Sequence, residues 1–208
     1  GILRQLSQEV GLRIVNKSDG GVSVYTDSGI TLFDVVPRAV EIRNEGPLLP
    51  GTPGPSVFID GVQVSGTNTV MTVRNGKLAA QLAVRDETTL IYEAQMDETA
   101  RSLISLFAET DQSPSPTLPP ATGLFTYDGA PALPAASTQL PGLAGQIKIN
   151  APFDDRLGGN PALLRDGGSN GLAYTNNSLG ESGYQLRLAE IADAFDVPFS
   201  FDSSARLG

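Results

Sequence analysis

The stretch LAAQLAVRDETTLIYEAQMDETARSLISLFA, residues 78–108, determines the fold class of this chain. Its apolar residues recur at intervals of four, four, three and four, at Tyr92, Met96, Ala100, Leu103 and Phe107. This spacing places them on one stripe of a single helix, which we expect over residues 81–111. Other residues fall off the stripe, among them Ala94, Gln95, Arg101 and Ser102. We therefore assign Tyr92, Met96, Leu103 and Phe107 to a helix-packing or assembly face.

Short strands and turns precede this helix. Val22, Val24 and Thr26 alternate with Ser23 and Tyr25, which is the period of a strand. Asn75-Gly76 is the strongest hairpin signal in the chain. The same reading predicts strands over 12–15, 22–26, 30–33, 35–43, 57–59, 62–64 and 70–73. Residues 12–80 are thus predicted to form an antiparallel β domain.

Two further helices are predicted near the ends of the chain. Ile2, Leu3, Leu6 and Val10 share one helical face over residues 1–11, and a last helix spans about 181–197. Between the second and last helices, Gly and Pro indicate irregular loops with extended segments at 124–127 and 146–150. The predicted fold is α+β. An antiparallel β domain, 12–80, is inserted into a discontinuous α-helical part with a long helix, formed by 1–11 and 81–208. The three helices are expected to pack against one another.

The chain contains no Cys and no His, and this limits its chemistry. Without them it has no disulfide, no thiolate nucleophile, no sulfur-based zinc site and no Ser-His-Asp triad. The remaining carboxylates give weak signals. Asp19 and Asp27 lie in turns that suit hairpins better than calcium sites, and the acids of residues 86–98 suit a solvated helix face with pairs such as Asp97–Arg101. We expect no catalytic residues, no metal site, no cofactor and no enzymatic activity.

One further group of carboxylates is a weak candidate for catalysis. Asp154, Asp155 and Asp166 could supply paired carboxylates for glycoside hydrolysis, but no aromatic platform surrounds them in the sequence. An enzyme is therefore the least favoured class.

The formal net charge of −9 disfavours nucleic acid and anionic membranes as partners. No apolar run is long enough to predict a transmembrane helix. The first residues, Gly1 to Gly11, show no signal peptide, and we expect the chain to be the central fragment of a longer protein. The same charge predicts that the isolated fragment is monomeric.

Three segments in this order resemble one known family. ILRQLSQEVGLRIVNKSDGGVSVYTDSGITLF (2–33) is similar to its helix-to-β junction, and GKLAAQLAVRDETTLIYEAQMDETARSLISLFAE (76–109), with Arg85, Asp86 and Glu87, is similar to its return into the core helix. GLFTYDGAPALP (123–134) resembles the stretch that follows. The family is that of the flagellar hook-associated protein FlgK, hook-associated protein 1, and the most similar variety is alphaproteobacterial. Its Asn…His motif is replaced here by FAETDQSPSPTLPP (107–120), and its terminal heptad segments are not in this chain.

The resemblance implies a structural subunit of the bacterial flagellum at the hook–filament junction. Such a subunit is secreted, exported unfolded and polymerised on the distal end of the hook, where it serves flagellum assembly and motility. The implied partners are other copies in a junction ring, the hook protein, the second junction protein and an export chaperone. The alternative is an extracellular adhesin-like binding module. Solvent-facing aromatic residues would favour it, and Tyr25, Phe33 and Phe58 are those available in the β domain.

Overall fold

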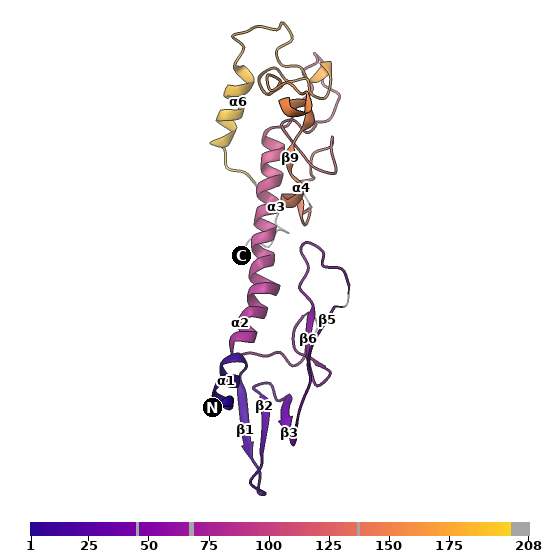
Figure 1. The fold of residues 1–208 in the computed structure, drawn as a ribbon. Helices are drawn as coiled ribbons and strands as arrows, with labels where there is room; N and C mark the ends of the chain where they lie inside the picture. Colours follow the sequence, from indigo (N-terminus) through magenta and orange to yellow (C-terminus); the bar gives the residue numbers. More distant parts are fainter. Residues whose placement is uncertain (45, 67–68, 137, 201–208) are drawn as a thin grey trace. The chain divides into compact units, whose positions relative to one another are not determined.

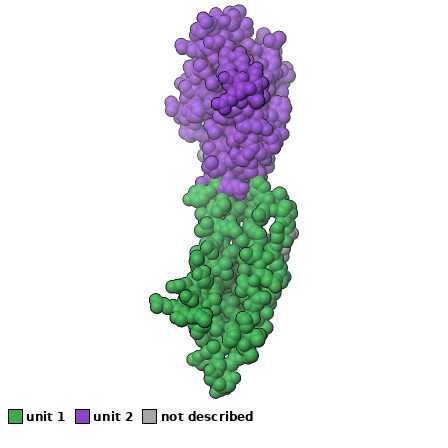
Figure 2. Space-filling model, in the orientation of Figure 1, with its two compact units in different colours: residues 1–92 green, residues 93–208 purple. Residues whose placement is uncertain are grey.

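The computed structural model describes residues 1–44, 46–66, 69–136 and 138–200. Two compact units divide the chain, the first formed by Gly1–Tyr92 and the second beginning at Glu93 (Figure 2). Residues 1–11 thus belong to the same unit as the segment 12–80. Each unit is described by itself below.

The first sheet of unit 1 is a four-stranded antiparallel meander. It consists of β1 (Leu12–Asn16), β2 (Val22–Thr26), β3 (Thr31–Asp34) and β4 (Val36–Pro37), in that order (Figure 1). Asp19 stabilises the first turn, because its Oδ1 accepts a hydrogen bond from the Gly21 N–H at 2.9 Å. Val35, between β3 and β4, has a φ of 65°.

The second sheet of unit 1 has three antiparallel strands, β5 (Val40–Arg43), β6 (Ser56–Ile59) and β7 (Val62–Gln63). All four residues of the central strand β6 are buried. The single strand predicted over 35–43 is therefore two strands in two sheets. The break falls directly after Pro37, which cannot donate to a sheet ladder.

Two other predictions in this segment were wrong. Residues 70–73 form no strand, and Asn75-Gly76 is not a hairpin turn. Gly76 has a φ of 95° and immediately precedes helix α2 (Lys77–Ala83). A Cβ at Gly76 would lie 2.7 Å from the Glu9 carbonyl oxygen, so a side chain there would clash with main chain. Both the positive φ and this close approach explain why residue 76 is Gly, and both occur here without a hairpin turn.

The β part of unit 1 is inserted between two helices that contact each other, α1 (Ile2–Glu9) and α2. The insertion is closed by a hydrogen bond of 2.9 Å from the Gly11 N–H to the Asn75 carbonyl oxygen. Beside this junction, the buried residues Val10, Ile30, Val57, Ile59, Val64 and Val73 form the core of the unit. Leu6 of α1 and Leu82 of α2 pack against that core.

The long helix begins earlier and ends earlier than predicted. After α2, a five-residue π-helix (Val84–Thr88) leads into α3 (Thr89–Leu106). Among the described residues, no helix is both long enough and apolar enough to span a bilayer.

Unit 2 packs short elements against one side of its part of α3. These are β8 (Phe125–Thr126), α4 (Leu143–Gln146), β9 (Lys148–Ile149), the 3-10 turns Ala151–Phe153, Asp155–Leu157 and Leu172–Tyr174, α5 (Leu163–Asp166) and α6 (Leu186–Phe195). Strands β8 and β9 pair antiparallel within the two segments predicted to be extended. Ile104, which is fully buried, packs with Ala100 and Leu143 at the centre of the unit.

Helix α6 begins later than the predicted residue 181. The side chain of Asn177 bonds both the carbonyl oxygen and the N–H of Glu181, which keeps this segment in a loop. Helices and small antiparallel sheets together confirm the predicted α+β class.

Candidate functional site

The four residues of the predicted packing or assembly face differ in their surroundings. Tyr92, the last residue of unit 1, is 63% exposed, and Met96 is 59% exposed. Leu103 is half-buried. Phe107 packs edge-on against two rings, Phe125 at 5.2 Å and Phe195 at 5.9 Å between centroids. Leu103 and Phe107 are therefore at least half-covered within unit 2, whereas Tyr92 and Met96 face solvent.

The buried side of α3 contains charged residues that sequence reasoning placed in solvent. Its buried residues are Ala94, Asp97, Glu98, Ala100, Arg101 and Ile104. Asp97 and Arg101 were expected to form an exposed ion pair, and this prediction was wrong. Arg101 instead pairs with Glu98 at 2.6 Å, with both side chains almost fully buried. The reason lies in unit 2, whose irregular segments need partners for their main-chain N–H groups and find them on this helix.

Asp97 is the clearest case. Its Oδ2 accepts from the Gly142 N–H and its Oδ1 from the Ala144 N–H, each at 2.8 Å. Both amides lie at the start of α4, where helix N–H groups have no partner within their own helix. A carboxylate on one helix thus caps another helix.

Arg101 makes a second set of contacts on the same helix. Its Nη2 donates to the Ser200 carbonyl oxygen at 3.1 Å, and its guanidinium lies 4.9 Å from the centroid of the Phe199 ring. Together with the Glu98 pair, these contacts hold the segment after α6 against α3.

Glu109 organises the loops after α3 and was missed by sequence reasoning. This fully buried carboxylate accepts from the main-chain N–H groups of Ser169 and Asn170, at 3.1 and 3.0 Å, and from the Asn170 side chain at 2.9 Å. The buried Arg187 guanidinium lies 3.8 Å from Glu109. Arg187 Nε and Nη2 have no hydrogen-bond partner among the described residues. Burial lowers the pKa of Arg187, and Glu109 partly opposes that effect.

The three carboxylates that are candidates for glycoside hydrolysis have other surroundings. Asp154 accepts from the Arg156 N–H, and Asp166 forms a two-pronged pair with Arg165 and accepts from the Asn177 side chain. The Arg165 and Asn177 hydrogen bonds hold the pKa of Asp166 below its usual value. Asp155 is exposed.

Asp27, whose turn could suit calcium, accepts a hydrogen bond from the Asn75 side chain at 2.7 Å. Over the described part of the chain, no group of three or more acidic side chains is arranged to hold a metal ion.

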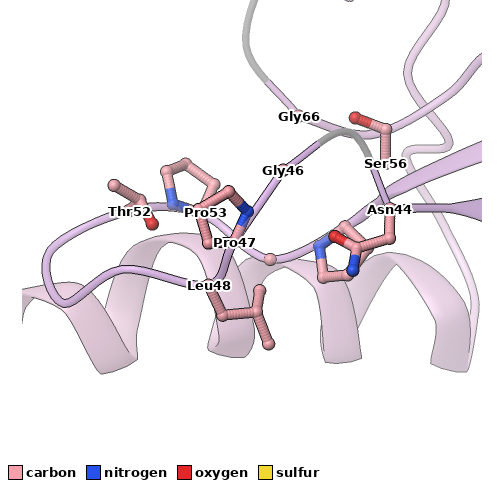
Figure 3. A pocket seen from close by; sticks show the side chains of 10 residues that line it. Asn44, Gly46, Pro47, Leu48, Thr52, Pro53, Ser56 and Gly66 are labelled. Atoms are coloured by element: carbon pink, nitrogen blue, oxygen red, sulfur yellow. The ribbon is translucent and has the colours of Figure 1, made fainter.

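A hollow of about 240 Å³ lies in unit 1 beside the proline-rich loop (Figure 3). The residues lining it, none of which is charged, are Asn44, Gly46, Pro47, Leu48, Thr52, Pro53, Gly54, Pro55, Ser56 and Gly66. The loop is fixed to the helix by Asp86, which accepts from the Gly54 N–H at 3.0 Å and pairs with Arg85. Burial tends to raise the pKa of Asp86, but the Arg85 and Gly54 hydrogen bonds lower it overall. The hollow offers main-chain groups and proline rings and no pair of catalytic side chains.

Large apolar side chains remain exposed on unit 1. Among the most exposed are Ile2 (81%), Val35 (78%) and Ile42 (70%). The described residues thus make an α+β protein with a helix-flanked β insertion, buried carboxylates that hold loops together, and uncovered apolar positions. No protein family, curated protein or solved structure matches this chain.

Proposed function

We propose that the protein is a structural subunit of the bacterial flagellum at the hook–filament junction, secreted and polymerised on the distal end of the hook. Its partners are other copies of itself in a junction ring, the hook protein, the second junction protein and an export chaperone. The observation that carries the proposal is the closed insertion between α1 and α2. A helix ends at Glu9, a β module follows, and the chain returns beside Glu9 at Gly76 to begin the next helix. This is the order in which the resembling segments 2–33 and 76–109 occur.

The chemistry of the described residues is consistent with a structural role. Its buried carboxylates, Asp97, Glu98 and Glu109, are occupied by main-chain N–H groups or by arginine. A chain without Cys cannot cross-link by disulfides while it is exported unfolded. Exposed apolar residues such as Ile2 and Met96 are available for contacts with neighbouring subunits.

The adhesin-like alternative lacks its expected feature. Exposed aromatic residues on the β module would favour a carbohydrate-binding or adhesive surface. Tyr25 and Phe33 are half-buried, and Phe58 is buried beneath the Arg43 guanidinium at 4.3 Å.

The test is genetic and uses the full-length gene in the bacterium that carries it. Deletion is expected to leave hooks without filaments, with flagellin released into the medium and motility lost. Complementation with an epitope-tagged full-length copy should restore filaments and place immunogold label where hook and filament meet. Normal filaments in the deletion strain, with attachment to surfaces lost instead, would exclude the junction role and support the adhesin-like module.

A further inference from the structure

Strand β5 is an edge of the second sheet, with its outer side unpaired in the described chain. The order of that sheet is β5-β6-β7, so β5 has a neighbour on one side only. The register pairs Val40 with Ile59, Glu41 with Phe58 and Ile42 with Val57. One residue further, the Asp60 N–H donates to the Ala39 carbonyl oxygen at 2.9 Å. Because hydrogen-bonded pairs alternate along an antiparallel ladder, Glu41 and Arg43 direct their main-chain groups toward β6. Val40 and Ile42 therefore direct theirs outward.

One face of the sheet is apolar at the β5 edge. Val40 and Ile42 lie beside Ile59 and Val57, which are buried in the core of unit 1. They are themselves 59% and 70% exposed. The apolar face thus continues from the buried strand β6 to an uncovered edge. Free edges of this kind pair readily with another strand.

The side chains of β5 identify that other strand as a second copy of β5. Glu41 and Arg43 flank Ile42 symmetrically and pair with each other within the strand, with Arg43 Nη2 2.9 Å from Glu41 Oε2. If two copies run antiparallel about a two-fold axis at Ile42, the outward N–H and C=O of one Ile42 meet those of the other. Glu41 of each copy then lies directly opposite Arg43 of its mate, in the non-hydrogen-bonded pairs of the ladder, so the two intrastrand ion pairs join into one cluster of alternating charge. Hydrogen bonding, apolar contact and charge are all satisfied by this one register, which is the self-complementarity that a two-fold interface requires.

We propose that the β5 edge is a self-recognition strand, through which two copies of this chain pair antiparallel about Ile42. The inference does not rest on the proposed flagellar function. A two-fold contact closes at two copies and cannot by itself propagate a ring. The edge is only four residues long, so pairing along it buries much less surface area than a stable interface does. The pairing is therefore weak and reversible, and the protein remains monomeric in dilute solution.

A chain without Cys allows the pairing to be trapped covalently. An Ile42→Cys variant of the 208-residue chain carries one thiol on the two-fold axis, where Cα separations in such a ladder suit a disulfide. Val62→Cys is the matched control, because Val62 is also exposed but lies on β7, at the opposite edge of the same sheet. Under mild oxidation Ile42→Cys is expected to give several-fold more disulfide-linked dimer than Val62→Cys. Equal yields would overturn the proposal.

Charge reversal then tests the register, with Ile42→Cys present throughout. Glu41→Arg places Arg opposite Arg43 of the mate, and Arg43→Glu places Glu opposite Glu41, so each variant alone should give less dimer. An equimolar mixture restores both opposite-charge pairs, and mass spectrometry should then show heterodimers in excess over either homodimer. Net charge alone predicts the reverse for Glu41→Arg, because this change reduces the negative charge of the chain. Statistical mixing, or more dimer from Glu41→Arg alone, would refute the register.

Discussion

The carboxylate of Asp97 lies 2.8 Å from the main-chain nitrogen of Gly142, 45 residues further along the chain. It is 1% exposed, and its second oxygen binds Ala144. In a unit with little regular structure, such a buried carboxylate supplies the hydrogen bonds that main-chain N–H groups would otherwise find in a sheet. Unit 2 depends on a few such hydrogen bonds, and individual substitutions can test them.

Asp97→Asn should lower the free energy of unfolding by about 1.5–3 kcal/mol, the range for hydrogen bonds to a charged group. The amide side chain retains one acceptor oxygen but must place an NH₂ group against a main-chain N–H. Denaturant unfolding followed by circular dichroism provides the measurement. Asp193→Asn, an exposed site on α6, is the control and should change the value by less than about 0.5 kcal/mol. Similar losses for both variants would show that the Asp97 bonds contribute nothing specific.

Phe107→Ala should cost about 2–5 kcal/mol, because it removes the ring that contacts both Phe125 and Phe195. Leu103→Ala, at a half-buried site, is expected at the lower end of that range. Met96→Ala should change stability by less than about 0.5 kcal/mol, since its side chain is largely exposed. Thermal unfolding of the three variants side by side would measure this order. A Met96 effect as large as that of Phe107 would mean that Met96 is covered in solution.

Glu109→Gln should be among the most damaging single changes, at about 3–5 kcal/mol, because it leaves the buried Arg187 charge without its counter-ion. Arg187→Met should be damaging for the converse reason. The double variant should be more stable than the sum of the two single losses predicts. A double-mutant cycle measured by chemical unfolding gives this coupling. Strict additivity would show that the two side chains do not interact at 3.8 Å.

Asp111 gives a pH-dependent prediction. The Leu118 N–H, with Ser113 and Thr117, donates to its carboxylate and lowers its pKa from the usual 3.8. The folded state therefore favours the charged form, and the stabilisation is complete above pH 3.8 and is lost as pH falls below that value. Asp111→Asn should melt at a lower temperature than the parent at pH 7, and the gap should narrow as the pH is lowered below 3.8. A gap of constant size down to pH 2 would contradict the assigned cause.

Val35→Gly should stabilise unit 1. Val35 has a φ of 65° and is 78% exposed, so its branched side chain occupies a strained left-handed backbone without compensating burial. Relief of that strain should exceed the added entropy of Gly in the unfolded chain, for a net gain of about 0.5–1 kcal/mol. Val36→Gly, one residue later in β4, should instead destabilise by a similar amount. Losses for both variants would show that Val35 is not strained.

Periodic patterns in the sequence predicted regular elements of this chain, but they did not predict its buried polar contacts. Strand period located β2, and the stripe around Ala100 located α3, although of the five stripe residues Ala100 alone is buried. Asp97, Glu98 and Arg101 lie off that stripe, so their charges suggested that they face solvent. Their actual partners are main-chain groups 45 or more residues away, or in one case a residue three positions away. No local pattern encodes the distant contacts.

Gly76 was misread for a related reason. A glycine after Asn suggests a positive φ, but a glycine with positive φ can stand in a hairpin turn or directly before a helix. What decides between them is the approach of Glu9 main chain to Gly76, a contact across the whole β insertion.

That same approach fixes both ends of the β insertion at one place. The chain leaves α1 at Gly11 and returns at Asn75, where a main-chain hydrogen bond of 2.9 Å joins the two ends. A replacement segment would need ends that meet at this spacing and apolar residues that cover Leu6 and Leu82, which pack against the core that the insertion supplies. Grafting another module between α1 and α2 therefore requires that this shared core be rebuilt as well.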